Sequence, residues 1–296
     1  MAGGEILQLQ KEATHGRIIF SVAVLFCVGT SMGSNYVYGG LTVEQHLEQD
    51  VPSEKRYFLA LTQEEVSWYL SLVPIVQMLG IMAGYPSGEW LGRKKVLILT
   101  CLFSILGYLI MLLSDNFWQL ILGRCINSFS IGFGSMMPFA LVSEISTIKA
   151  RAPASVVANL SFSFGGLLSF MFTYIFPLSY LIYLSILLSL TFLFLSPLLP
   201  ESPQFLARHG QLDEARRVYA RLRGPAYRGV EEEIAEVLAL SAVQEKKPEV
   251  RWMSRWRERT FLEPLGILIC LFFFLSVNGI DCPLFFYGPK MFGEFG

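Results

Sequence analysis

"EWLGRKK", residues 89–95, places one acidic and three basic residues between two long apolar stretches. A single soluble core cannot absorb such stretches in this chain. Its 296 residues are 53% hydrophobic and 14% aromatic, with a mean hydropathy of +0.49, and this composition leaves a surplus of apolar surface. We expect that surplus to face lipid, with the charged stretch in a loop at the edge of the membrane.

Apolar runs of about 20 residues match the hydrocarbon thickness of a bilayer. The sequence contains seven: residues 18–40, 66–87, 96–113, 117–142, 155–176, 178–199 and 265–287. The first run is longer than the apolar region of a signal peptide and lacks a clear small-residue cleavage site, so we keep it as a span. The sequence predicts an all-α membrane protein with an N-terminal tail (1–17), a six-helix bundle (18–200), a helical linker (201–260) and a seventh membrane helix (261–296).

Lysine and arginine mark the cytoplasmic loops of membrane proteins. Seven of these residues lie in the tail and in the two loops that share its side, namely Lys11, Arg17, Arg93, Lys94, Lys95, Lys149 and Arg151. The opposite side carries only Lys55 and Arg56. We expect a cytoplasmic N-terminus in a multi-pass protein, with the cell membrane as the default location. The partners expected are the lipid bilayer and a substrate, and no nucleic acid.

Acidic residues also stand at helix ends on the predicted cytoplasmic side. Glu144 follows the fourth span, Glu201 follows the sixth, and Glu89 precedes Arg93 in the opening stretch. Arg93 is placed to reach one of these acids and Arg151 another, which predicts ion pairs between helix ends. If the pairs form in one conformation only, Glu89, Arg93, Glu144, Arg151 and Glu201 act as a conformational latch. The plainer interpretation is that the bases only hold the loop on its side.

The linker begins with a readable helix start, in which Ser202 is the N-cap and Pro203 the first helical residue. One face of the following helix carries Leu212, Ala215, Tyr219 and Leu222. Gly224-Pro225 ends it, and a second helix is predicted from Val230 to about Ala242. We expect both helices to lie under the membrane bundle; the alternative is a solvated linker.

Catalysis and metal binding have no support in the residue pattern. The three histidines are scattered, and the five cysteines lie in apolar runs without a CxxC spacing. We therefore expect no enzyme, no cofactor and no metal. Glycines at four-residue spacing, Gly29 and Gly33 and then Gly80, Gly84 and Gly88, predict close helix contacts. Arg124, within the fourth span, needs a partner or a water pocket.

Three motifs in order resemble the sugar porters of the major facilitator superfamily, and most closely their insect facilitated trehalose transporters. They are "EWLGRKK", "GRCINSFSIGFGSMMPFALVSEISTIKAR" (123–151) and "PESPQFLARHGQLDEA" (200–215). The resemblance implies a major-facilitator fold of two six-helix halves with a sugar held between them. This chain would supply the N-terminal bundle and the first helix of the second half. We therefore expect a truncated form that is inactive alone.

The resemblance also implies where a sugar binds and how transport is driven. Ser155, Asn159 and Ser163 form a polar stripe on the fifth span, and Asn159 stands near the position of a sugar-binding glutamine in the family. In the seventh span Ser276, Asn278 and Asp281 are the candidates, although Leu275 and Ser276 replace the usual glutamines. The first span carries no acidic residue, whereas proton-coupled members place an aspartate there, so facilitated uniport of trehalose or a hexose by alternating access is expected. Proton coupling through Asp281 remains open.

Two other classes of protein fit part of the pattern. A seven-helix receptor fits the number of spans but leaves "GRKK", "PESPQ" and the long cytoplasmic segment unexplained. A transport-dead relative that senses sugar or modulates a full-length porter would explain the substitutions at Leu275 and Ser276.

Overall fold

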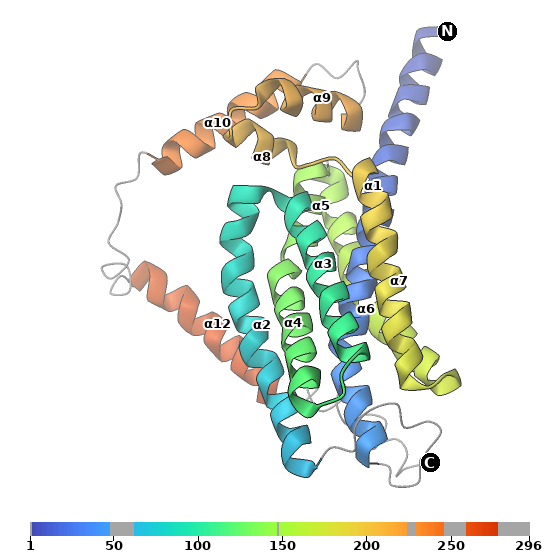
Figure 1. The fold of residues 1–296 in the computed structure, drawn as a ribbon. Helices are drawn as coiled ribbons and strands as arrows, with labels where there is room; N and C mark the ends of the chain where they lie inside the picture. Colours follow the sequence, from blue (N-terminus) through green and yellow to red (C-terminus); the bar gives the residue numbers. More distant parts are fainter. Residues whose placement is uncertain (1, 48–61, 147, 224–228, 246–258, 278–296) are drawn as a thin grey trace. The chain divides into compact units, whose positions relative to one another are not determined.

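The computed structural model describes residues 2–47, 62–146, 148–223, 229–245 and 259–277, and the regular structure in these ranges is helical (Figure 1). The chain forms two compact units, residues 1–234 and 235–296. Among the described residues of the first unit, six segments are long and apolar enough to span a membrane: 18–42, 64–91, 93–112, 117–145, 150–175 and 178–198. The predicted six-helix bundle is confirmed.

The bundle is built from α1 (Ala2–Leu47), α2 (Gln63–Leu91), α3 (Arg93–Leu112), α4 (Phe117–Gly134), α5 (Met137–Ile145), α6 (Ile148–Ile175), α7 (Leu178–Leu195) and a 3₁₀ turn, η2 (Ser196–Leu198). Three short helices follow, α8 (Pro203–Arg208), α9 (Leu212–Arg223) and α10 (Val230–Glu245). The second unit also contains α12 (Arg259–Val277), which covers the first part of the predicted seventh span. Residues 278–287 of that span lie outside the described residues.

The predicted fourth span is divided between α4 and α5 at Ser135 and Met136. Pro138 lies in the first turn of α5, where a backbone N–H has no partner within the helix and its absence costs nothing. Within a continuous helix the same proline would remove a hydrogen bond, so α4 ends before it. The Ser135 hydroxyl donates to the Gly132 carbonyl at 2.9 Å and satisfies one of the groups freed by the break. A break in the helix thus divides this span into two parts.

The packing of the bundle places α1 and the α4–α5 span on the inside. α1 packs on α6 and α7, while α4 packs on α2 and α3. Within the most apolar 18-residue stretch of each span, the buried share of the residues is 67% in α1 and 61% in the α4–α5 span. The corresponding share is 17% in α2 and 28% in α6. The buried centre includes Val28, Leu97, Leu141 and Phe192. α2 and α6 therefore present most of their surface outward.

Two helices approach most closely where α1 meets α6. A Cβ atom added to Gly33 would lie 1.9 Å from the Phe162 carbonyl oxygen, and one added to Gly165 would lie 2.1 Å from that of Thr30. Such distances leave no room for a side chain. The predicted close contacts of the spaced glycines are confirmed, because an added Cβ would meet neighbouring helices at 1.9–2.7 Å at Gly29, Gly33, Gly80, Gly84 and Gly88.

Serine hydroxyls join α1 to its two neighbours inside the bundle. Ser31 and Ser189 are 2.8 Å apart, Ser34 and Ser185 are 3.0 Å apart, and Ser169 donates to Ser34 at 2.8 Å. These bonds satisfy polar groups that have no access to water, and they hold α6 and α7 against α1.

The linker helices follow the predicted pattern with one interruption. The Ser202 hydroxyl accepts the Phe205 N–H at 3.1 Å, which confirms the N-cap. The helix then stops at Arg208, because Gly210 adopts a left-handed conformation with φ of 75°. The predicted apolar face is confirmed in α9, whose Ala215, Tyr219 and Leu222 are buried.

Candidate functional site

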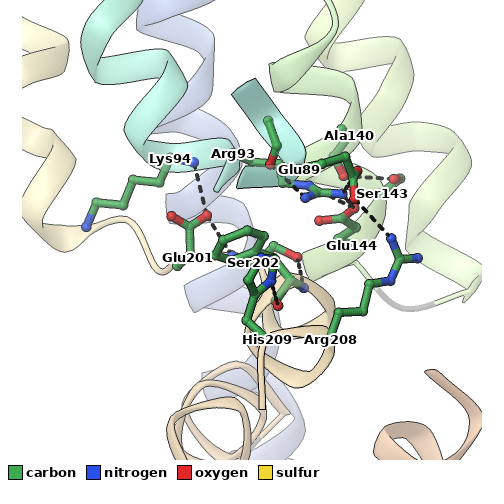
Figure 2. A network of polar contacts seen from close by, with 12 residues as sticks. Glu89, Arg93, Lys94, Ala140, Ser143, Glu144, Glu201, Ser202, Arg208 and His209 are labelled. Carbon is green, nitrogen blue, oxygen red and sulfur yellow. Dashed lines mark hydrogen bonds and ion pairs between the residues drawn. The ribbon is translucent and has the colours of Figure 1, made fainter. Parts of the chain in front are cut away.

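An arginine at the start of α3 joins three helix ends at one end of the bundle (Figure 2). The Nη2 atom of Arg93 donates to Glu89 Oε1 at 2.7 Å, and its Nε atom donates to Glu144 Oε1 at 3.2 Å. Its Nη1 atom donates to the Gly88 carbonyl at 2.9 Å. The centroid of the Phe205 ring of α8 lies 5.6 Å from the Cζ atom of the Arg93 guanidinium. Since Arg93 is 5% exposed, this end, called the α8 end below, holds a nearly buried cation between two carboxylates.

The turn between α2 and α3 brings Glu201 to the start of α3. Gly92 has φ of 97°, a conformation that favours glycine. The Glu201 carboxylate accepts the Lys94 backbone N–H at 3.0 Å and the Ser202 N–H at 3.1 Å. The sequence predicted an arginine partner for this acid. The first turn of α3 offers free N–H groups and the positive end of the helix dipole, and the carboxylate binds there instead.

Arg151 also takes a backbone partner. Its Nε atom donates to the Ser143 carbonyl at 3.2 Å, near the end of α5 where the last carbonyls lack partners within the helix. Within the described part of the chain, the structure gives Arg151 no ion pair with Glu144 or Glu201. Arg208, which sequence reasoning missed, reaches Glu89 at 3.6 Å and extends the cluster to α8. The available signal was its place in the last turn of a predicted helix.

We expect Gly92→Ala to destabilise the protein by about 1–3 kcal/mol, since a non-glycine residue is strained in this backbone conformation. The added Cβ would also lie 2.6 Å from Glu201 Oε2 and displace it from α3. Thermal unfolding in detergent measures the effect. Gly210→Ala is the matched control, because Gly210 has a positive φ but nothing lies within 4 Å of its Cβ position. Equal shifts in both variants would contradict a role for the Glu201 contact.

The predicted sugar residues lie partly on α6 and partly outside the described residues. Asn159 and Ser163 are exposed on one side of α6, while the Ser155 hydroxyl donates to the Arg151 carbonyl at 2.9 Å. Ser276 belongs to α12, with a side chain that is not described, and Asn278 and Asp281 lie beyond the described residues. The structure therefore brings Asn159 and Ser163 onto one accessible face.

Arg124 lies inside the bundle on α4 with 2% exposure. Its Nη1 atom donates to the Asn35 carbonyl at 3.3 Å and to the Asn35 side-chain oxygen at 3.4 Å. The rings of Tyr38 and Tyr69 lie 5.8 and 5.7 Å from the guanidinium carbon. Arg124 thus connects α4 to α1 and α2 through uncharged groups, and Asn35 is a partner that sequence reasoning did not single out.

Ion pairs outside the membrane spans connect α9 to the start of α10. Arg216 bonds Glu231 at 2.8 Å, and Arg223 pairs with Glu233. The hydrogen bond from Arg216 lowers the pKa of Glu231, and the same bond raises the pKa of Arg216. The ion pair of Glu231 therefore stabilises the folded state at pH values above the ordinary pKa of a glutamate. This stabilisation is lost as the pH falls through the lowered pKa of Glu231 in the folded protein.

A family model described as "Sugar (and other) transporter" matches residues 19–296. The chain belongs to this family of sugar transporters. Among curated relatives, the facilitated trehalose transporter Tret1 of Polypedilum vanderplanki is 24% identical over 290 residues, which is 98% of this chain and 57% of the relative. Tret1 of Drosophila willistoni is 28% identical over 236 residues, 80% of this chain and 27% of the relative. The chain therefore spans from about a quarter to somewhat over half of the length of these relatives.

Solved structures show the same fold for this chain. The proton:xylose symporter XylE bound to 6-bromo-6-deoxy-D-glucose superposes with a TM-score of 0.67, at 17% identity, over 79% of this chain and 55% of that one. A double-tryptophan mutant of XylE gives a TM-score of 0.68, at 19% identity, over 94% of this chain and 63% of that one. The bundle is thus part of a major facilitator superfamily fold in a multi-pass membrane protein.

Proposed function

We propose that this sugar transporter moves trehalose or a hexose across the cell membrane by facilitated uniport and alternating access, with its N-terminus in the cytoplasm. It acts as a carrier and not as an enzyme, and it needs no cofactor. The family supports a sugar substrate, and two relatives are named facilitated trehalose transporters. The observation that carries uniport is the contact between Arg124 and Asn35.

A proton-coupled carrier needs a buried group that takes up and releases a proton during the cycle. A carboxylate beside a cation can do this, whereas a neutral amide cannot. In this bundle the oxygens bonded by the buried Arg124 belong to Asn35. The span at residues 18–42 also contains no aspartate or glutamate. These features support transport driven by the sugar gradient alone.

Asn159 and Ser163 are the proposed sugar contacts in this half of the transporter. An amide both donates and accepts hydrogen bonds, as a sugar hydroxyl requires. Both residues are exposed on a helix whose remaining outward face is largely apolar, including Leu160 and Leu167. Polar side chains in spans usually face a bundle interior or a water-filled cavity. Ser276, Asn278 and Asp281 are proposed to complete the site from the seventh span.

Uptake of labelled trehalose and glucose into vesicles that contain the full-length protein tests this function. We expect saturable uptake that stops at equal concentrations inside and outside, with or without an imposed pH gradient. Accumulation driven by the pH gradient would contradict uniport. Sugar binding without uptake would instead favour a transport-dead sensor.

We expect Asn159→Ala to raise the KM for the transported sugar about tenfold. The loss of one or two hydrogen bonds removes about 1.4 kcal/mol of binding, which corresponds to this factor. Labelled uptake at several sugar concentrations measures the change. The control is Leu160→Ala, because Leu160 is also exposed on α6 but offers no hydrogen bond. An unchanged KM in Asn159→Ala would remove this residue from the site.

The charged cluster at the α8 end is the proposed conformational latch. Arg93, Glu89 and Glu144 connect the ends of α2, α3 and α5, and Glu201 holds the start of α3. Arg151 ties α6 to the end of α5. We propose that these contacts persist only while the α8 end is closed, so that opening that end must break them.

A further inference from the structure

One edge of the Arg124 guanidinium has no hydrogen-bond partner among the described residues. The unbonded atoms are Nε and Nη2, which lie on the same edge of the planar group and present two parallel N–H groups. Within the described ranges, Nη1 is the atom that donates, to Asn35 at 3.3 and 3.4 Å. These distances exceed the usual range for N–H···O bonds. The strongest donor edge of the side chain is therefore unused.

The charge of Arg124 is also uncompensated within the described part of the bundle. The oxygens that it reaches there belong to Asn35 and carry no charge. Tyr38 and Tyr69 offer their ring faces, which attract a cation but do not neutralise it. A guanidinium in the interior of a membrane protein is costly without an anionic partner. The residue therefore needs a negative charge at its open edge.

Two buried hydroxyl groups lie near the guanidinium. The hydroxyls of Tyr38 and Tyr69 both lie near Thr42, and neither has a partner at standard hydrogen-bond geometry within the described residues. The backbone of α1 limits the space beside the Nη2 atom of Arg124, since a Cβ added to Gly39 would lie 2.3 Å from that atom. These surroundings favour a small ligand that only accepts hydrogen bonds.

We propose that Arg124 binds one small inorganic anion of the chloride class at its Nε and Nη2 edge. A bidentate N–H edge suits an anion, and charge-assisted bonds of this kind are the strong ones. Occupancy would neutralise the guanidinium where it joins α4 to α1 and α2. Chloride would thus stabilise the bundle. This site is separate from the proposed sugar contacts and does not depend on transport.

The melting temperature of the purified full-length protein in detergent tests the site, with chloride compared with gluconate at equal ionic strength. We expect chloride to raise the melting temperature by about 3 °C at roughly ten times its Kd, and the rise to continue with the logarithm of the chloride concentration. Asn35→Asp is the decisive variant, because its carboxylate would neutralise Arg124 from the opposite edge. In that variant the response to chloride should disappear without loss of stability in gluconate.

Two further variants separate this site from general salt effects. Lys95→Gln removes an exposed cation at the α8 end and should keep the full response to chloride. Arg124→Gln should abolish the response; if this variant does not fold, Asn35→Asp still decides the question. The absence of a chloride response in the unmodified protein, or a response retained in Asn35→Asp, would overturn the proposal.

Discussion

Gly33→Ala is expected to destabilise the bundle by about 3 kcal/mol, at the upper end of the usual cost of overpacking, because the added methyl group forces two backbones apart. The added Cβ would lie 1.9 Å from the Phe162 carbonyl oxygen and 2.8 Å from its carbonyl carbon. Both atoms belong to the backbone of α6 and cannot rotate away. α1 must therefore separate from α6, which also strains the bond between Ser169 and Ser34. Folded yield and thermal unfolding of the full-length protein in detergent measure the loss.

Gly16→Ala is the matched control on the same helix. Nothing lies within 4 Å of a Cβ atom at Gly16, and alanine is the better helix former by about 1 kcal/mol. The control should be unchanged or slightly more stable. Similar losses in both variants would show that the effect belongs to α1 as a helix and not to its contact with α6.

The six membrane helices could be predicted because the thickness of a bilayer sets the length of an apolar run. Their ends could not. α6 begins at Ile148, seven residues before the predicted start at Ser155. The prediction began too late because the first turns of the helix carry charged residues, which are left out when a span is chosen by its hydropathy. The division of the fourth span at Ser135 was also missed. Hydropathy finds the lipid-facing length, while hydrogen bonding decides where a helix begins and ends.

The charged cluster shows how far sequence reasoning reaches into the site. Charge and topology were sufficient to bring Arg93 and Glu144 to the same end of the bundle. They did not give the partners of Glu201 and Arg151, because unpaired backbone groups at helix ends compete with side chains for the same charges. Asn35 was missed for a related reason: a lone amide in an apolar span does not reveal which neighbour it faces.

Arg93→Met is expected to open the α8 end of the bundle. The change removes the cation but keeps most of the length of the side chain, and it leaves Glu144, whose side chain is 11% exposed, without its ion-pair partner. Breaking a buried pair by removing one partner costs about 3 kcal/mol. If the pair exists only in the closed conformation, the ratio of open to closed protein rises about a hundredfold. Labelling of single cysteines at the α8 end of the full-length protein measures the shift.

Two variants test whether the shift arises from the ion pair. Lys95→Met removes an exposed charge from the same turn of α3 and should leave labelling unchanged. Arg93→Met combined with Glu144→Met removes both charges, so most of the closed population should return, and the double-mutant cycle isolates the energy of the pair. If the single variant unfolds the protein without exposing the α8 end, or if labelling does not change, the cluster stabilises the fold but is no latch.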